Sequence, residues 1–142
     1  MDKTDLRIVE ILQKNGRISL KDLGKEVGLT SPAVSERVKR LEENGVILGY
    51  KAIINPQKVN KHIQAFIHTS MERDKYNRFL EYANNISSII ECYHVTGGNS
   101  MILKVMVETM EQLEALIDDI KKIGNTQTSI ILSSPIEDKI II

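Results

Sequence analysis

The polar residues between positions 30 and 40 have the types and the spacing to contact DNA. Hydroxyl and carboxylate groups can hydrogen-bond to base edges in the major groove, and arginine or lysine can also neutralise phosphates. The candidate residues are Thr30, Ser31, Ser35, Glu36, Arg37, Lys39 and Arg40. A solvated helix surface has a similar composition, so the prediction of DNA binding depends on the elements that present these side chains.

Three helices and a tight turn are predicted to present them. Asp2 is a suitable N-cap for a first helix that ends at Gly16, and Ser19 caps a short second helix. Gly28 permits a sharp turn into a third helix, which ends near Asn44. The apolar positions that we expect to face inward are Leu6, Val9, Leu12, Leu20, Leu23, Val27, Val34, Val38 and Leu41. A short helix, a glycine turn and a longer helix make a helix-turn-helix.

The rest of the chain is predicted to alternate between strands and helices. Residues 46–54 are expected to form one or two strands, a wing, and residues 55–60 a linker. The expected strands are 63–71, 89–96, 101–108 and 126–133, the expected helices are 76–86 and 110–122, and 139–142 is a candidate edge strand. We therefore predict an α+β fold, with a winged helix-turn-helix domain over 1–54 and a ferredoxin-like βαββαβ domain over 61–142.

The composition is typical of a globular protein of the cytoplasm. The 142 residues are 42% hydrophobic and 27% charged, and no apolar run approaches the roughly 20 residues of a membrane span. The polar, acidic start is unsuited to a secretory signal, and the single cysteine, Cys92, excludes an internal disulfide. The net charge is zero, but residues 1–52 carry 10 Lys and Arg against 8 Asp and Glu, which leaves two positive charges in excess. We therefore expect a cytoplasmic location.

Enzymatic and metal chemistry have little support in the sequence. It contains no Gly-rich phosphate loop and no nucleophile elbow. His62, His68 and His94 lack cysteine or carboxylate neighbours at metal-ligand spacing. We predict no catalytic residue, no metal and no cofactor.

Three segments resemble the Lrp/AsnC family, the leucine-responsive or feast/famine transcription regulators. Residues 29–47, followed by Gly49 and Tyr50, are similar to the family's recognition helix and wing. Residues 95–105 are similar to its glycine loop and the following strand, and residues 126–128 to its Thr-x-Thr. The resemblance implies a transcription regulator whose partners are double-stranded DNA, further copies of itself in dimers and octamers, and an amino-acid effector at the junctions between dimers.

The resemblance also implies which residues bind the effector. They are Gly97, Gly98, Asn99, Ser100, Met101, Thr126 and Thr128. The glycines and the asparagine suit a plain hairpin turn as well, because they tolerate positive φ. The family loop often carries an aspartate at the position of Ser100 and an aromatic residue at that of Met101, and the segment before Thr126 is shorter than usual. Serine can accept a hydrogen bond from an ammonium group, but it supplies no charge.

Two alternatives stay open. An effector-independent member of the family could wrap or bridge DNA as a multimer. Sirohaem decarboxylases share the layout, but they need a pocket lined by histidine and arginine, and the second half contains only Arg73 and Arg78 as arginines. The apolar end, Ile140 to Ile142, is predicted to be buried at a subunit interface.

Overall fold

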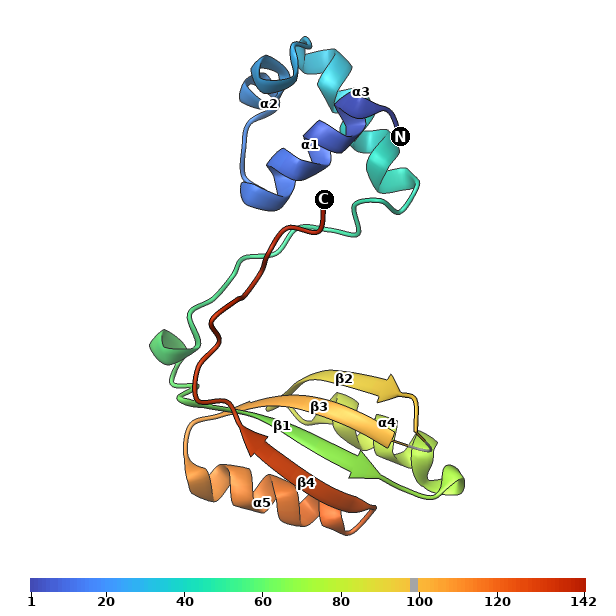
Figure 1. Ribbon diagram of the computed structural model, residues 1–142, viewed down its shortest axis with the longest axis vertical. Helices are drawn as coiled ribbons and strands as arrows, with labels where there is room; N and C mark the ends of the chain where they lie inside the picture. The colour runs from blue at the N-terminus through green and yellow to red at the C-terminus, as the bar shows by residue number, and fades with distance from the viewer. Residues whose placement is uncertain (98–99) are drawn as a thin grey trace. The chain divides into compact units, whose positions relative to one another are not determined.

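Helices α1 (Lys3–Lys14), α2 (Leu20–Val27) and α3 (Ser31–Glu43) form the helix-turn-helix that the sequence predicts (Figure 1). The structure is a computed structural model that describes residues 1–97 and 100–142. It divides into two units. The first unit comprises Met1–Ile53 together with Ile136–Ile142, and the second comprises Ile54–Pro135.

The three helices enclose an apolar core. Its buried members are Ile8, Val9, Ile11, Leu23, Val34, Val38 and Leu41. The predicted inner stripe of α3 is confirmed, but Leu6 and Leu20 are exposed. The inward stripe of α1 is centred on Ile8 and Ile11, so Leu6 lies outside it, and Leu20 is only the first residue of α2.

The turn between α2 and α3 depends on a close backbone approach at Gly24. A Cβ atom on Gly24 would lie 2.6 Å from the carbonyl oxygen of Leu29, closer than real Cβ contacts. The Leu29 N–H donates to the Gly24 carbonyl at 2.8 Å, and Gly28 ends α2 in the left-handed conformation. The side chain of Ser19 accepts the N–H of Asp22 at the start of α2, as predicted, whereas Thr30 is the N-cap of α3 without a side-chain bond. Gly24 therefore sets where α3 begins.

Two aspartates of α1 hold the middle of α3. Asp2 and Asp5 form a capping box, in which the side chain of each accepts the backbone N–H of the other. The Nη1 atom of Arg37 lies 2.7 Å from Asp2 Oδ2 and 2.7 Å from Asp5 Oδ1. The Nη2 atom of Arg40 lies farther away, 3.8 Å from Asp5 Oδ1. We call the group formed by Asp2, Asp5 and Arg37 the clasp.

The residues after α3 do not form a strand, and the side chain of Tyr50 anchors them to the helix. The first unit contains no strand in residues 1–53 or 136–142, so the strands expected over 46–54 and 139–142 are wrong. The hydroxyl of Tyr50 donates to Glu42 Oε1 at 2.9 Å. Burial and the neighbouring Glu42 carboxylate raise the pKa of Tyr50 to about 12, which keeps it a neutral donor. The backbone N–H of Ile141 donates to Gln13 Oε1 at 2.8 Å, so the C-terminal segment is bound to α1.

The second unit has the predicted βαββαβ order. Its elements are β1 (Ile63–Ser70), α4 (Tyr76–Asn85), β2 (Ile89–Val95), β3 (Ser100–Val107), α5 (Met110–Lys121) and β4 (Asn125–Ile130). Short 3-10 helices cover Pro56–Val59 and Arg73–Lys75. The strands form one antiparallel sheet in the order β2-β3-β1-β4, with β1 and β3 at its centre (Figure 1).

The two faces of this sheet differ in what covers them. Alternate residues of β1 and β3 point into a core that α4 and α5 complete with Phe79, Ala83, Leu113, Leu116 and Ile120. The opposite face carries Phe66, Tyr93 and Ile102, on neighbouring strands, and neither α4 nor α5 covers it. None of the helices in the described residues is long and apolar enough to span a membrane.

Gly24→Ala should destabilise the first unit, although alanine is the better helix former. The added Cβ meets the backbone of Leu29, so the free energy of unfolding should fall by about 1–3 kcal/mol. Gly16→Ala is the matched control, because its Cβ would lie an ordinary 3.6 Å from Tyr50 Cδ1. Chemical denaturation measures both variants. Equal midpoints for Gly24→Ala and the wild type would show that the turn is not constrained there.

Acid should loosen the first unit through the clasp. Hydrogen bonds from the Asp5 N–H and from Arg37 lower the pKa of Asp2. Burial raises the pKa of Asp5, but hydrogen bonds from the Asp2 N–H and Arg37 outweigh it and leave that pKa below 3.8. Both carboxylates therefore stabilise the fold above that pH, and this stabilisation is lost as the pH falls through their lower folded values.

Urea unfolding between about pH 6 and about pH 2.5 measures this loss. Asp5→Asn should flatten the acid end of the profile, because the group that titrates is removed. Glu26→Gln, which removes an exposed carboxylate of α2, should leave the profile as it is. A wild-type profile that is flat over this range would contradict the assignment.

Candidate functional site

The polar residues of α3 line two neighbouring rows of the helix. Ser31, Ser35 and Lys39 follow one another at a spacing of four, and Glu36 and Arg40 form the next row. Lys39 and Arg40 are exposed, with 66% and 53% of their side-chain surface accessible. Val34, Val38 and Leu41 are buried in the core, whereas Glu36, Lys39 and Arg40 lie on the exposed side of the helix, and Ser31 and Ser35 are half-buried at its edge. The structure therefore brings together six of the seven predicted residues, counting Thr30 at the helix start.

The cations of α3 differ in how firmly they are held. Lys39 Nζ lies 3.7 Å from Glu43 Oε1, and Arg40 Nη2 lies 3.8 Å from Asp5, both longer than a hydrogen bond. The exposed Lys39–Glu43 pair contributes about 0–1 kcal/mol, so a phosphate can displace it, and Arg40 is too far from Asp5 to donate a hydrogen bond to it. Arg37, the seventh predicted residue, makes two bonds of 2.7 Å to α1 and is only 27% exposed. Its guanidinium points to α1 and not to the exposed rows.

The start of α3 adds backbone donors to these side chains. The first-turn N–H groups of a helix have no partner within the helix, and they carry partial positive charge. Thr30 makes no side-chain bond to them. The N-terminus of α3 is thus suited to an anion such as a phosphate, next to Ser31 and within two turns of Lys39.

The predicted effector residues lie near the ends of three strands. A hollow of about 350 Å³ is lined by His68, Thr69, Ser70, Ser100, Met101, Asn125, Thr126 and Gln127. It includes three of the predicted residues. Thr128 lies outside the hollow but on the same strand face as Thr126, opposite Ile67. Gly98 and Asn99 fall outside the described residues.

The loop residues next to this hollow have local roles. Gly97 has a φ of 108°, which glycine adopts without strain, and its carbonyl accepts the Ser100 hydroxyl at 2.9 Å. Ser100 and Met101 are consecutive in β3, so their side chains leave opposite faces of the sheet. Met101 is almost fully buried and packs in the core of the second unit.

Sequence reasoning missed Thr69. Its side chain is 3% exposed, and its Oγ1 has no hydrogen-bond partner among the residues that the structure describes. Thr69 lies in register between Met101 on β3 and Thr126 on β4. A side chain at Gly124 would lie 3.1 Å from this hydroxyl and would collide with the Ser70 carbonyl. The sequence does place Thr69 at an inward position of β1, and a buried hydroxyl usually needs a hydrogen-bond partner. This position could therefore have been noted from the sequence.

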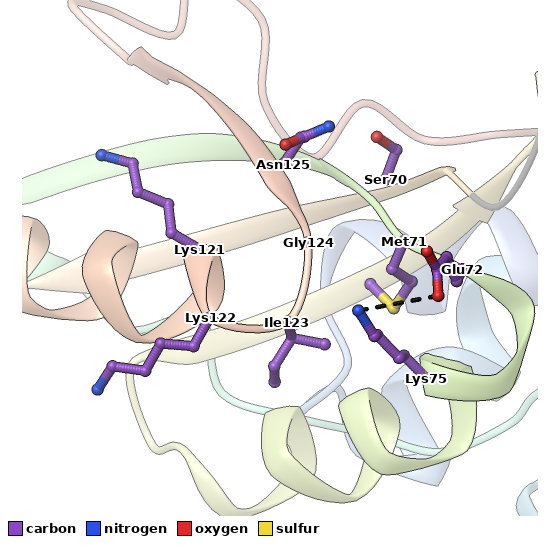
Figure 2. Close-up of a pocket in the computed structure, with 9 residues that line it drawn as sticks. All are labelled: Ser70, Met71, Glu72, Lys75, Lys121, Lys122, Ile123, Gly124 and Asn125. Carbon is purple, nitrogen blue, oxygen red and sulfur yellow. Dashed lines mark ion pairs between the residues drawn. The ribbon is translucent and has the colours of Figure 1, made fainter.

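A second hollow, of about 570 Å³, lies between the end of β1, the 3-10 helix Arg73–Lys75 and the start of β4 (Figure 2). It shares Ser70 and Asn125 with the first hollow. Three lysines line it, but each has a carboxylate three residues away: Lys75 with Glu72, Lys121 with Asp118, and Lys122 with Asp119. Figure 2 shows Lys121 and Lys122 extending away from Gly124. This hollow therefore offers little uncompensated positive charge.

Metal chemistry has no candidate in the described part of the chain. No group of three histidine, cysteine, aspartate or glutamate residues in residues 1–97 and 100–142 could hold a metal ion.

Comparisons with known proteins cover both units. A family model described as winged helix-turn-helix DNA-binding matches residues 1–47, and one described as the Lrp/AsnC ligand binding domain matches residues 64–141. The chain is 42% identical over 134 residues to the uncharacterised HTH-type transcriptional regulator YezC of Bacillus subtilis, covering 94% of this chain and 95% of YezC.

Solved structures agree with these matches. LrpC of Bacillus subtilis has a TM-score of 0.91 at 31% identity, over 98% of this chain and 99% of LrpC. The transcriptional regulator NMB0573 of Neisseria meningitidis, solved as a complex with L-methionine, has a TM-score of 0.91 at 27% identity, over 96% of this chain and 93% of that one. With both units matched and a relative 42% identical along nearly the whole chain, this protein is a DNA-binding transcription regulator of the Lrp/AsnC family, a family of regulators and not of enzymes.

Proposed function

We propose that α3 enters the major groove of DNA and reads sequence with its exposed rows. Thr30, Ser31, Ser35 and Glu36 face base edges near the N-terminus of the helix, and Lys39 and Arg40 face phosphates. The observation that carries this assignment is the exposure of Lys39 and Arg40, whose present ion pairs are long and weak. Arg37 is left out of the contact set because both of its short bonds go to α1.

We infer that an amino acid binds at the hollow lined by Ser70, Ser100 and Asn125. The observation that carries this proposal is that these residues are in register on β1, β3 and β4, so their polar side chains share the sheet face opposite the core. The carboxylate of an amino acid could accept hydrogen bonds from the Ser70 hydroxyl and the Asn125 amide. The L-methionine complex of the Neisseria relative supports an amino acid as the ligand class.

The α-ammonium group of such a ligand finds no charged partner in this hollow. None of its eight lining residues is acidic, and Ser100 supplies only a neutral oxygen. An ammonium group left without a compensating charge is costly to bury. A second copy of the chain therefore completes the site, in agreement with an effector bound where subunits meet.

Self-association through the uncovered sheet face is part of this proposal. Tyr93 of β2 is paired with Ile102 of β3, and Phe66 of β1 lies diagonally from Ile102, on the face that α4 and α5 leave free. An apolar patch on a sheet face is stabilised when a second copy covers it. Pairing of two sheets in this way gives a dimer with two DNA-binding units.

Replacing Lys39 and Arg40 by alanine should weaken binding to every DNA sequence. Each lost phosphate contact lowers the steepness of log affinity against log salt by about 0.9. Fluorescence anisotropy with a labelled mixed-sequence duplex, over a series of salt concentrations, measures this slope. Lys21→Ala with Lys25→Ala, on α2, is the charge-matched control. An unchanged slope in the α3 variant would reject these two phosphate contacts.

Amino acids should raise the thermal midpoint of the wild-type protein. A ligand at about 100 times its dissociation constant adds about 2.7 kcal/mol to stability. Ser70→Ala should reduce the shift, because it removes a hydroxyl that lines the hollow. The unliganded variant should be as stable as the wild type, since Ser70 is exposed.

The control for this experiment is Ser129→Ala, which removes an exposed hydroxyl of β4 that lies outside the hollow. It should keep the ligand shift. A panel of the twenty amino acids that leaves the wild-type midpoint unchanged, with DNA binding intact, would reject the amino-acid effector and leave an effector-independent regulator.

A further inference from the structure

Every carboxylate oxygen of the clasp accepts a hydrogen bond. Asp2 Oδ1 accepts the Asp5 N–H at 2.8 Å, and Asp5 Oδ2 accepts the Asp2 N–H at 3.1 Å. The other oxygens, Asp2 Oδ2 and Asp5 Oδ1, both accept Arg37 Nη1 at 2.7 Å. Each of the four oxygens thus has a donor, and Arg37 is the member of the clasp that comes from α3.

Burial makes this arrangement costly to disturb. Asp5 is only 6% exposed, so its charge is largely removed from water. A buried carboxylate that loses its cation is strongly destabilised. If Arg37 turned to a DNA phosphate, Asp5 would be left without its 2.7 Å partner, next to a negatively charged duplex. Arg40, at 3.8 Å, is the nearest replacement, and it would then be withdrawn from the DNA surface.

The clasp also fixes the rotation of α3 about its axis, which apolar packing alone leaves poorly determined. Val34, Val38 and Leu41 hold α3 against the core, but hydrophobic contact is non-directional and tolerates small rotations of a helix. The two short bonds from Arg37 run to a fixed point, the first turn of α1. They therefore determine the rotation of α3 about its axis, and with it the direction of the rows that contain Ser35 and Lys39.

We propose that Arg37 is a positioning residue for DNA recognition: clasped by Asp2 and Asp5, it fixes the rotation of α3 and makes no contact with DNA. The proposal rests on α3 being the helix that contacts DNA. It assigns to Asp5 a role in sequence specificity, although Asp5 is buried and acidic.

Asp5→Asn tests the proposal, because a positioning role and a simple charge effect predict opposite changes in DNA affinity. In asparagine an NH2 group replaces one of the two acceptor oxygens, so it would face either the Asp2 N–H or Arg37, both of which are donors, and one of the two bonds is lost. Removing a negative charge near DNA should strengthen binding if charge alone matters. A misdirected α3 should instead weaken binding to a duplex that the wild type selects from a random pool, by roughly 5- to 150-fold, as a mismatched base pair does.

Binding of the same variant to a mixed-sequence duplex separates positioning from general instability. Its affinity there should equal or exceed that of the wild type, because phosphate contacts carry that binding. Glu26→Gln, which removes an exposed carboxylate of the same unit, is the control and should not lose selected-site affinity. Selected-site affinity of Asp5→Asn at or above the wild-type level would overturn the proposal.

The pair Asp5→Asn with Arg37→Met keeps the net charge of the unit and tests for a phosphate contact of Arg37. The salt slope should stay at the wild-type value, whereas a lost phosphate contact would lower it by about 0.9 and contradict us. Lys39→Ala with Arg40→Ala, assayed in parallel, shows whether α3 contacts DNA at all. If that slope is also unchanged, the assignment of α3 fails, and the positioning role of Arg37, which rests on it, is rejected with it.

A measurement on the wild type avoids variants that fold poorly. Arginine side-chain NMR signals report whether a guanidinium can rotate. They can be recorded for the protein alone and for the protein bound to the selected duplex. The signals of Arg37 should show restricted rotation in both states and should move little when DNA binds. A shift of the Arg37 signals on DNA binding as large as that of Arg40 would show that Arg37 changes partner, against the proposal.

Discussion

The DNA-binding unit depends on the buried carboxylate of Asp5. Its two oxygens join the first turn of α1 to itself, through the Asp2 N–H, and to α3, through Arg37. Removal from water makes the bonds to this charge both short and difficult to exchange. Apolar contacts hold the three helices together, but a charged, directional contact determines how the recognition surface is turned. Lys39 and Arg40 are exposed, and the buried acid is already paired with Arg37.

In the second unit, by contrast with the paired Asp5, a buried polar group has no hydrogen-bond partner among the described residues: the hydroxyl of Thr69. The absence of a side chain at Gly124 lets the start of β4 approach the end of β1, and Thr69 is thereby buried beside the backbone. The hollow proposed for the amino acid lies on the other face of the sheet, and none of its lining residues is acidic. Under that proposal, the folded state is stabilised by a bound ligand and by a second copy of the chain that supplies the missing charge.

The sequence predicted well wherever neighbouring residues decide the structure. The caps at Asp2 and Ser19, the buried stripe of α3 and the βαββαβ order are all found. The strands expected over 46–54 are absent, because a strand needs a partner to bond with and the first unit has none in residues 1–53 or 136–142. Tyr50 anchors that stretch through Glu42 instead, a contact that apolar periodicity does not report.

The sequence by itself predicted the family and the two kinds of domain, and it proposed the residues of the two sites. Residue type, spacing and capping act over a few positions, and these can be read along the chain. Only the tertiary structure divided the cations of α3 into exposed Lys39 and Arg40 and clasped Arg37, since the partners of Arg37 lie 32 and 35 positions away. It alone revealed Thr69 as a buried hydroxyl without a partner. Both decisions depend on burial and on distances across the fold, which no local pattern contains.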